Sequence, residues 1–293
     1  MGTAATATPV DPKILVQQAL KKITTIATLP EITARIIKTV EDRKSSAAQL
    51  HQLVAHDPAL VTRILKVVNS SFYGLPGQIA SVERAIVLLG LNAVKNIAVA
   101  SSLGQMFRGA MLCDGFAAKD LWSHCVAVGV TARELSKQLK LPCGDEAFLA
   151  GMIHDIGLLV SLQTAPEELR RICEAAKNDP RQFCEIEREI ADVDHQQLGA
   201  GLAEVWKFPR SCQLVAGFHH EPSTLSDDAR RLVTIIHIAD TLCCQTGQGF
   251  NLTAAHQELD AAAMQDLAVD SAIIQQLKQR IPDLVKDAGS LIS

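Results

Sequence analysis

Candidate metal ligands are spread over five short segments in the second half of the chain. Histidine and aspartate stand there within mostly apolar sequence, as in LWSHCVAV, AGMIHDIGLL, AGFHHEPS and IIHIADTL, and a further histidine follows an aspartate in ADVDHQQLG. Imidazole and carboxylate together form a donor set that suits Mn, Fe, Co, Ni or Zn, and the carboxylates could also bind Mg. The candidate ligands are His124, His154, Asp155, His195, His219, His220 and Asp240.

The two doublets favour a site that can hold one metal or two. Neighbouring residues on a helix point about 100° apart, so His154 and Asp155 cannot easily share one face, but they can border a cleft that holds two ions side by side. Burying the charge of Asp155 or Asp240 among Ile, Leu and Ala is costly without a partner or a metal. Taken singly, each histidine could equally be a hydrogen-bonded core residue, and only the five segments together favour a metal site.

The elements that must position these residues are predicted to be helices. Apolar residues recur at helical spacing along nearly the whole chain, strict alternation is absent, and aromatic residues make up only 4% of the sequence. We therefore predict an all-α fold, with a long helix over 146–164 carrying the first doublet. The expected parts are a flexible leader at 1–12, an N-terminal helical bundle at 13–113 and a second helical domain with C-terminal helices at 114–293.

Composition and charge narrow the class of partner and the compartment. A net charge of −4 argues against duplex nucleic acid, which needs a clustered positive field. No block of Lys and Arg suggests a membrane anchor, and no apolar run was expected to approach the length of a membrane helix. The 8 cysteines form no C-x-x-C pair, so we expect buried thiols. Without a recognisable signal peptide, the simplest expectation is a cytoplasmic protein.

The order H…HD…H…HH…D resembles the HD-domain superfamily of metal-dependent phosphohydrolases, in the branch that includes the HD-GYP phosphodiesterases and the HDOD signalling domains. The first half resembles the HDOD family, through LPEITARI, HDPALVTRILKVVNSSFYGLPG and AIVLLGLNAVKN. The resemblance continues through GMIHDIGLLV, HQQLGAGLAEVWKFP and FHH, and it covers about residues 14 to 245.

This resemblance implies an N-terminal helical bundle packed on an HD-like helical core, and a role in bacterial signal transduction as an output or adaptor module. It also implies that the seven candidate residues ligate one or two divalent ions, such as Fe, Mn, Ni or Zn, with Mg possible. The chain departs from the HD-GYP enzymes at Leu158, where they typically carry lysine, and it lacks the GYP triplet after the histidine doublet. Hydrolysis of cyclic-di-GMP is therefore not expected.

Three functions remain open from the sequence, of which two are favoured. The first is a regulatory module that acts by binding a partner signalling protein or a nucleotide-like small ligand. The second is a metal-dependent phosphohydrolase in which Asp155 bridges two ions and serves catalysis by positioning a water whose pKa the metals lower. In that case possible phosphate clamps, each of which could equally be a solvated surface charge, are Lys95, Arg133, Lys207 and Arg210. Nucleic-acid binding is a third and weaker alternative.

Other residues could support the site from outside. His237 stands one helical turn before Asp240 and is either an outer partner of the ligands or a plain hydrogen-bonded histidine. Glu187, eight residues before His195, resembles a recurring acid of the family, and we interpret it as structural, through capping or pairing. The segment SSFYGLPG is either a partner-binding loop or a tight turn with packed rings.

Overall fold

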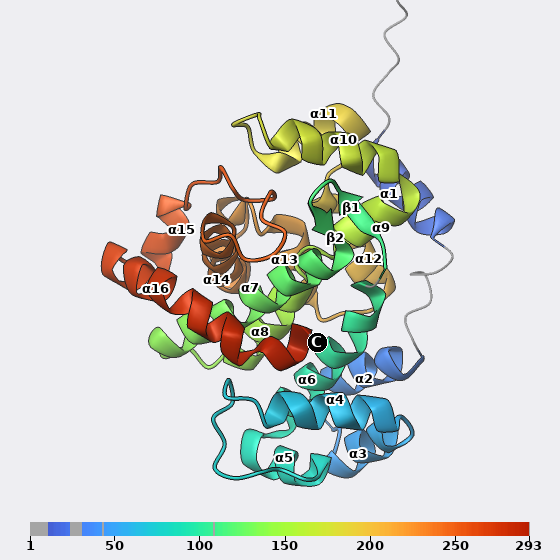
Figure 1. Ribbon diagram of the computed structural model, residues 1–293, viewed down its shortest axis with the longest axis vertical. Helices are drawn as coiled ribbons and strands as arrows, with labels where there is room; N and C mark the ends of the chain where they lie inside the picture. The colour runs from blue at the N-terminus through green and yellow to red at the C-terminus, as the bar shows by residue number, and fades with distance from the viewer. Residues whose placement is uncertain (1–10, 24–30, 43, 108, 293) are drawn as a thin grey trace, which may run out of the picture.

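The computed structural model describes residues 11–23, 31–42, 44–107 and 109–292. Most of this described part is helical and almost none of it is strand, which confirms the predicted fold class (Figure 1). Most of the predicted leader falls on residues 1–10, outside the described residues, and its last two residues begin a helix instead: Asp11 caps α1, which starts at Pro12.

Five helices form a bundle at the lower end of Figure 1, namely α2 (Glu31–Glu41), α3 (Ala47–Ala55), α4 (Pro58–Val68), α5 (Val82–Leu89) and α6 (Leu91–Leu103). Side-chain caps define where two of them begin. Ser46 and Gln49 form a capping box on α3, and the Asp57 carboxylate accepts a hydrogen bond of 2.9 Å from Leu60 N in α4. Helix α6 is buried from residue 93 to residue 103 and packs against the other four, so it forms the centre of this bundle.

The second half is a core of helices that pack on one another. The elements after α6 are η1 (Gly104–Phe107), β1 (Met111–Cys113), β2 (Phe116–Ala117), α7 (Ala118–Gln138), α8 (Gly144–Ile153), α9 (Ile156–Thr164), α10 (Pro166–Ala176), α11 (Phe183–Ala191), α12 (His195–Val205), α13 (Arg210–Phe218), η2 (Pro222–Thr224), α14 (Asp227–Gln245), α15 (Ala261–Asp266), α16 (Ser271–Asp287) and α17 (Gly289–Ile292). The long helices α7 and α14 pack against each other, and α8 packs on both, while α12 packs against α9 and α13.

The helix predicted over 146–164 is wrong as a single element. The structure divides it into α8 and α9, with a turn at His154 and Asp155, and Asp155 occupies the position before α9 with φ −98° and ψ 18°. The apolar pattern runs through the break without interruption, because both helices are buried on all sides. Because of this turn, the side chains of His154 and Asp155 are not held at the angle of about 100° that separates neighbouring residues on one helix.

The same stretch corrects the expectation about membrane helices. Among the described residues, Gly144–Thr164 is long and apolar enough to cross a membrane by length and composition. However, 83% of its most apolar window is buried inside the protein, as in the core helices of soluble proteins. The long apolar run is therefore accounted for by core packing.

Helix α1 (Pro12–Lys22) does not join the bundle predicted at 13–113. It packs instead on α12 and α9 of the second half. The contact is close at Gly201, where an added Cβ would lie 2.6 Å from Val16 Cγ1. A short antiparallel pair, β1–β2, is joined by a turn at Gly115, which has φ +86°. The predicted buried thiols are confirmed, since all eight cysteines are free and only Cys143 is partly exposed.

The crossing of α9 and α12 depends on a glycine next to the first doublet. A Cβ on Gly157 would overlap the backbone carbonyl oxygen of His195 and would lie 2.7 Å from Gly199 N. Both neighbours are main-chain atoms, so a side-chain rotation cannot relieve the overlap. The close approach of these two helices therefore requires a residue without a side chain at this position.

We expect Gly157→Ala to destabilise the protein by about 3 kcal/mol, at the upper end of the usual cost of overpacking, because α12 must move away from α9. Urea denaturation followed by circular dichroism measures the change. The control is Gly144→Ala, where an added Cβ would meet Arg133 Cγ at an ordinary 3.5 Å. Equal stability of the two variants would contradict the role given to this crossing.

Candidate metal centre

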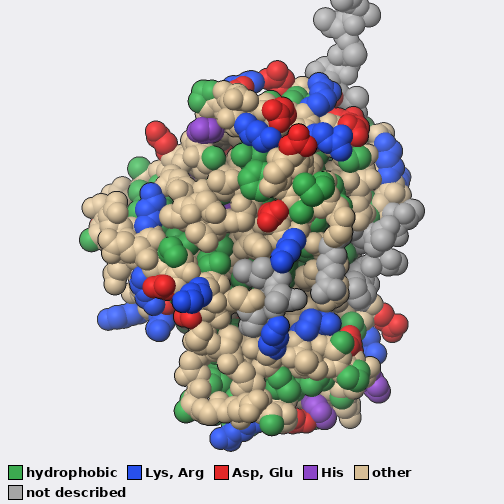
Figure 2. Space-filling model, in the orientation of Figure 1, with side chains coloured by type: hydrophobic (Ala, Val, Ile, Leu, Met, Phe, Trp, Pro, Cys, Tyr) green, Lys and Arg blue, Asp and Glu red, His purple; other side chains and the backbone are tan. Residues whose placement is uncertain are grey.

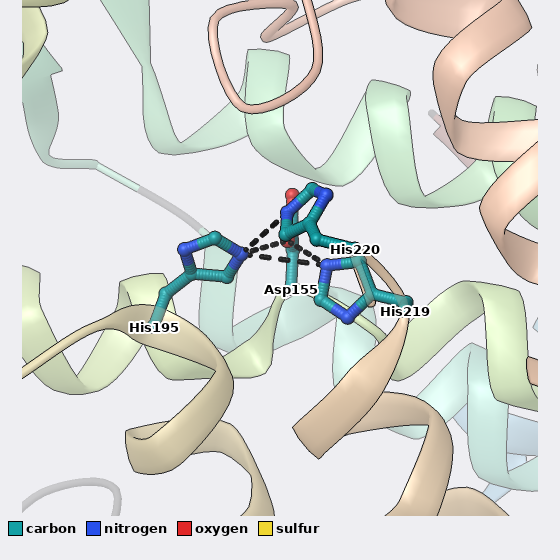
Figure 3. Close-up of side chains that lie close together, drawn as sticks. All are labelled: Asp155, His195, His219 and His220. Atoms are coloured by element: carbon teal, nitrogen blue, oxygen red, sulfur yellow. Dashed lines mark hydrogen bonds and ion pairs between the residues drawn. The ribbon is translucent and has the colours of Figure 1, made fainter. Parts of the chain in front are cut away.

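The structure brings all seven predicted ligands into one buried cluster. His124 comes from α7, His195 is the first residue of α12, and Asp240 comes from α14. His154 and Asp155 lie at the turn between α8 and α9, and His219 and His220 directly follow α13. Six of the seven side chains are fully buried, and His220 is 6% exposed. Figure 3 shows His195, His219 and His220 directed toward Asp155.

Asp155 lies at the centre, and its two oxygens face different histidines. Oδ2 is 3.4 Å from His154 Nε2 and 3.8 Å from His124 Nε2. Oδ1 is 3.3 Å from His195 Nε2 and 3.4 Å from His219 Nε2. A carboxylate with this arrangement can give one oxygen to each of two neighbouring ions.

The other ligands complete the two halves of the cluster. Asp240 Oδ1 is 3.0 Å from His124 Nε2 and 3.7 Å from His154 Nε2, so it belongs with the Oδ2 side of Asp155. We call His124, His154, Asp155 and Asp240 the first half-site. On the Oδ1 side, the ligand atoms of four residues all lie within 4.8 Å of one another, and we call Asp155, His195, His219 and His220 the second half-site.

All five histidines are oriented in the same way. Each ring bonds through Nδ1 to an oxygen on its outer side, which places a proton on Nδ1 and directs Nε2 into the cluster. The pairs are His124 with Gln248 O at 3.1 Å, His154 with Gly151 O at 2.7 Å, His195 with Glu187 Oε2 at 2.6 Å, His219 with Val215 O at 3.0 Å and His220 with Gln257 Oε1 at 2.6 Å.

This orientation leaves the inner atoms in need of a positive charge. His195 Nε2 lies 3.0 Å from His220 Nε2 and 3.4 Å from His219 Nε2, so the inner nitrogens of three rings lie close together. Among the described residues, four more inner atoms are buried without a hydrogen-bond partner, namely His154 Nε2, both Asp155 oxygens and Asp240 Oδ2. Such orphaned groups are costly, and here they converge on one place. The donor set fits divalent metal ions.

The protonation of the cluster depends on its own charges. Burial alone would lower the pKa of His154, but Asp155 and Asp240 outweigh burial and raise this pKa to about 10. Burial would raise the pKa of both aspartates, but the neighbouring histidines hold each pKa well below its usual range. Burial lowers the pKa of His219 and His220. Burial would also lower the pKa of His195, but Glu187 and Cys184 outweigh burial and raise it. A metal ion would therefore meet the carboxylates, His219 and His220 without a proton to displace, whereas His154 and His195 must each first lose one.

An outer layer of residues holds the ligands in place. His237 donates through Nδ1 to the backbone oxygen of His219 at 2.9 Å and accepts at Nε2 from Asp260 N at 3.0 Å. His237 therefore contacts the candidate ligand His219 from outside the cluster. Sequence reasoning missed Gln248 and Gln257, which follow α14 and provide acceptors for His124 and His220. These residues lie in a polar loop, and no periodicity or motif indicated which of them would reach the ligands.

Among the described residues, the four possible phosphate clamps make no hydrogen bond or ion pair with the cluster. Lys95 donates to Ser45, and Arg133 pairs with Asp145 at 3.3 Å while its guanidinium lies over the rings of Phe72 and Tyr73. Lys207 and Arg210 are exposed, and Arg210 bonds to Gln213. Leu158, which replaces the lysine of the HD-GYP enzymes, is fully buried. The described part of the site is therefore rich in metal donors but has no cationic side chain in contact with them.

Comparison with known proteins shows the family and the fold. The HDOD domain family model matches residues 26–222, which is more than half of the chain. An uncharacterised protein of Treponema pallidum (strain Nichols) is 26% identical over 226 residues. That match covers 75% of this chain and 42% of the Treponema protein, so the chain spans less than half the length of this relative.

Solved structures share the fold at low sequence identity. An HDOD domain protein of unknown function from Geobacter sulfurreducens has a TM-score of 0.74 at 18% identity, covering 93% of this chain and 98% of that one. A Shewanella amazonensis protein named as a candidate phosphohydrolase has a TM-score of 0.73 at 21% identity, covering 94% and 98%. A Marinobacter aquaeolei protein named as a candidate signal transduction protein has a TM-score of 0.76 at 22% identity, covering 100% and 69%. With the family model matched across both helical halves, the chain belongs to the HDOD domain family.

Proposed function

We propose that this chain is a signalling module whose conformation depends on a buried centre of one or two divalent ions, with Fe, Mn, Ni and Zn as the favoured metals and Mg as a further candidate. The observation that carries the proposal is the common orientation of the five histidines, with Nδ1 bound to an outer oxygen and Nε2 directed at two buried carboxylates. Core histidines without a metal have no reason to share this arrangement.

Helix α8 supports a regulatory role because it joins the centre to the N-terminal bundle. Its C-terminal end is followed directly by His154 and Asp155. Near its other end, the carbonyl oxygen of Asp145 accepts a hydrogen bond of 2.8 Å from Asn96 of α6, and Phe148 packs on Phe72 with ring centroids 5.9 Å apart. A change in the ligands at one end of this buried helix would reach the bundle surface at the other end.

A metal-dependent phosphohydrolase is the second candidate, favoured by the Asp155 carboxylate that faces both half-sites. Bound ions would supply polarisation of a phosphoryl oxygen and a water of lowered pKa. The residues of this chain provide few of the other groups that phosphate hydrolysis needs. All ligands are buried or nearly so, and the described cluster includes no Lys or Arg that would hold a phosphate. We therefore place regulation before catalysis.

The proposed partner is another signalling protein or a nucleotide-like small ligand, in the bacterial cytoplasm. A groove of about 830 Å³ between α4 and α7 is bordered by Arg63, Lys66 and Lys119 and offers a place for a small anionic ligand. Elsewhere on the face shown in Figure 2, basic side chains are spread over several parts and acidic ones lie among them. This distribution disfavours a long nucleic acid as the partner.

Metal content tests the proposal first. We expect the purified protein to hold one or two divalent ions per chain by elemental mass spectrometry, and Asp155→Ala to lose most of them because both half-sites share this carboxylate. The exposed Asp283→Ala serves as the control and should keep the wild-type content. A wild-type protein that stays free of metal after chelator-free purification and metal add-back would sink the proposal.

Metal affinity should rise with pH. His154, with a pKa raised to about 10, is protonated at neutral pH in the metal-free protein and must lose this proton to bind an ion. Affinity should therefore strengthen from pH 6 to pH 8, by about tenfold per pH unit for each proton displaced, or about 1.4 kcal/mol. Calorimetric titration with Co²⁺ in buffers of different ionisation enthalpy measures both affinity and proton release. Binding without pH dependence would contradict the protonation state described for His154.

Turnover separates the two candidate functions. We expect the metal-loaded protein to hydrolyse phosphomonoesters, phosphodiesters and nucleotides no faster than Asp155→Ala does, because no described cation reaches the cluster to hold the phosphate. A chromogenic phosphodiester and a nucleotide panel, with product followed by chromatography, provide the measurement. Metal-dependent hydrolysis that disappears in Asp155→Ala would instead establish the phosphohydrolase.

A further inference from the structure

The outer partners of the five ligand histidines differ in charge. Three of them are main-chain carbonyl oxygens, and Gln257 contributes a neutral amide oxygen. The partner of His195 is a carboxylate, that of Glu187 on α11. Among the described residues, His195 is thus the one ligand histidine whose outer nitrogen hydrogen-bonds to a carboxylate; the carboxylate facing His220 Nδ1, that of Asp240, lies 3.8 Å away.

Glu187 holds His195 at two points through one oxygen. Oε2 lies 2.6 Å from the ring Nδ1 and 3.0 Å from the backbone N of the same residue. The carboxylate therefore fixes the first residue of α12 and the orientation of its ring together. Cys184 Sγ, 3.9 Å from Nδ1, and the Phe183 ring, with its centroid 5.9 Å from that of His195, pack around the same imidazole. The side chain of Glu187 is only 2% exposed, so solvent does little to weaken the bond.

This carboxylate also balances the charge of the two half-sites. The first half-site contains Asp240 and shares Asp155, whereas the second half-site has the shared Asp155 and three imidazoles. Without Glu187, a divalent ion in the second half-site would meet less negative charge than one in the first. A charged acceptor on Nδ1–H also makes Nε2 a stronger donor to a metal and fixes its direction.

From these contacts we propose that Glu187 is a positioning residue for the second half-site alone, and that it lets this half-site hold a divalent ion independently of the first. The proposal rests on the metal centre proposed above. On this proposal each half-site has its own affinity for a divalent ion. Glu187 then sets the occupancy of the second half-site, while the ion in the first half-site stays bound.

The test is a titration of metal-free protein with Co²⁺, followed by calorimetry and by the visible absorption of the bound ion. We expect the wild type to bind two ions. Glu187→Gln has nearly the same shape and keeps an oxygen for the backbone N of His195. It should bind one ion with wild-type affinity and absorption, and the other about 10–100-fold more weakly. The control is Glu185→Gln, an exposed glutamate on the same helix, which should bind as the wild type does.

The outcomes distinguish this role from the metal centre itself. A wild type that binds no Co²⁺ overturns both. A wild type that binds one ion, or a Glu187→Gln protein with both affinities intact, overturns the role of Glu187 and leaves the centre standing. Equal weakening of both ions in a variant with a native unfolding transition shows a general structural effect and also overturns the role.

A second measurement avoids the variant if Glu187→Gln fails to fold. In ¹⁵N-labelled wild type, the chemical shifts of the His195 ring should show a proton on Nδ1 and none on Nε2 once Zn²⁺ is bound. The Nδ1 proton should resonate further downfield than those of His154 and His219, whose partners are neutral carbonyls. A metal-bound His195 without a proton on Nδ1, or with an Nδ1 shift like those two, would overturn the proposal.

Discussion

The burial of the Asp155 carboxylate, which both half-sites share, is the constraint on which the rest of the structure depends. A fully buried carboxylate is stable only if positive or hydrogen-bonding groups surround it, and here both oxygens lack a described hydrogen-bond donor and face imidazole nitrogens. To place those nitrogens, the fold must bring together the ends of α8 and α13, the start of α12 and the middle of α7 and α14. The break between α8 and α9 and the glycine-dependent crossing at Gly157 follow from the same requirement, because both bring main chain close to this carboxylate.

More of the candidate site than of the surrounding fold could be predicted from the sequence. All seven candidate residues lie in one cluster, because a histidine or aspartate within an apolar helical pattern must point into the core, and the core of one helical domain is small. The break at His154 was missed because hydrophobic periodicity does not change where one fully buried helix follows another. The position of α1 was missed for a related reason. Its apolar face shows that it packs on something, but Val16 alone does not reveal that the partner is Gly201.

The outer layer shows what sequence cannot provide. Glu187 could be predicted to cap or pair, yet its bond to His195 depends on how α11 crosses the start of α12. Gln257 reaches His220 from a loop whose path is set by several weak contacts, including its bond to Thr241 at 2.5 Å and that of His237 to Asp260. Arg133 illustrates the opposite error. Its charge suggested a phosphate clamp, but its guanidinium is already engaged by Asp145 and two aromatic rings at the junction with the N-terminal bundle.

The contact between α8 and the N-terminal bundle is the strongest structural argument for a regulatory role. Helix α8 cannot slide along α7 without disturbing it, because a Cβ on Gly151 would lie 2.7 Å from the Cα of Gly129 and the two backbones are in close contact. A shift at His154 must therefore move α8 and α7 together or be absorbed at the opposite end of α8. At that end stand Asp145, Asn96 and the Phe72 ring, which belong to the contact between the two halves. Packed interiors change by discrete rearrangement more readily than by gradual deformation, so metal occupancy would select between arrangements of the bundle.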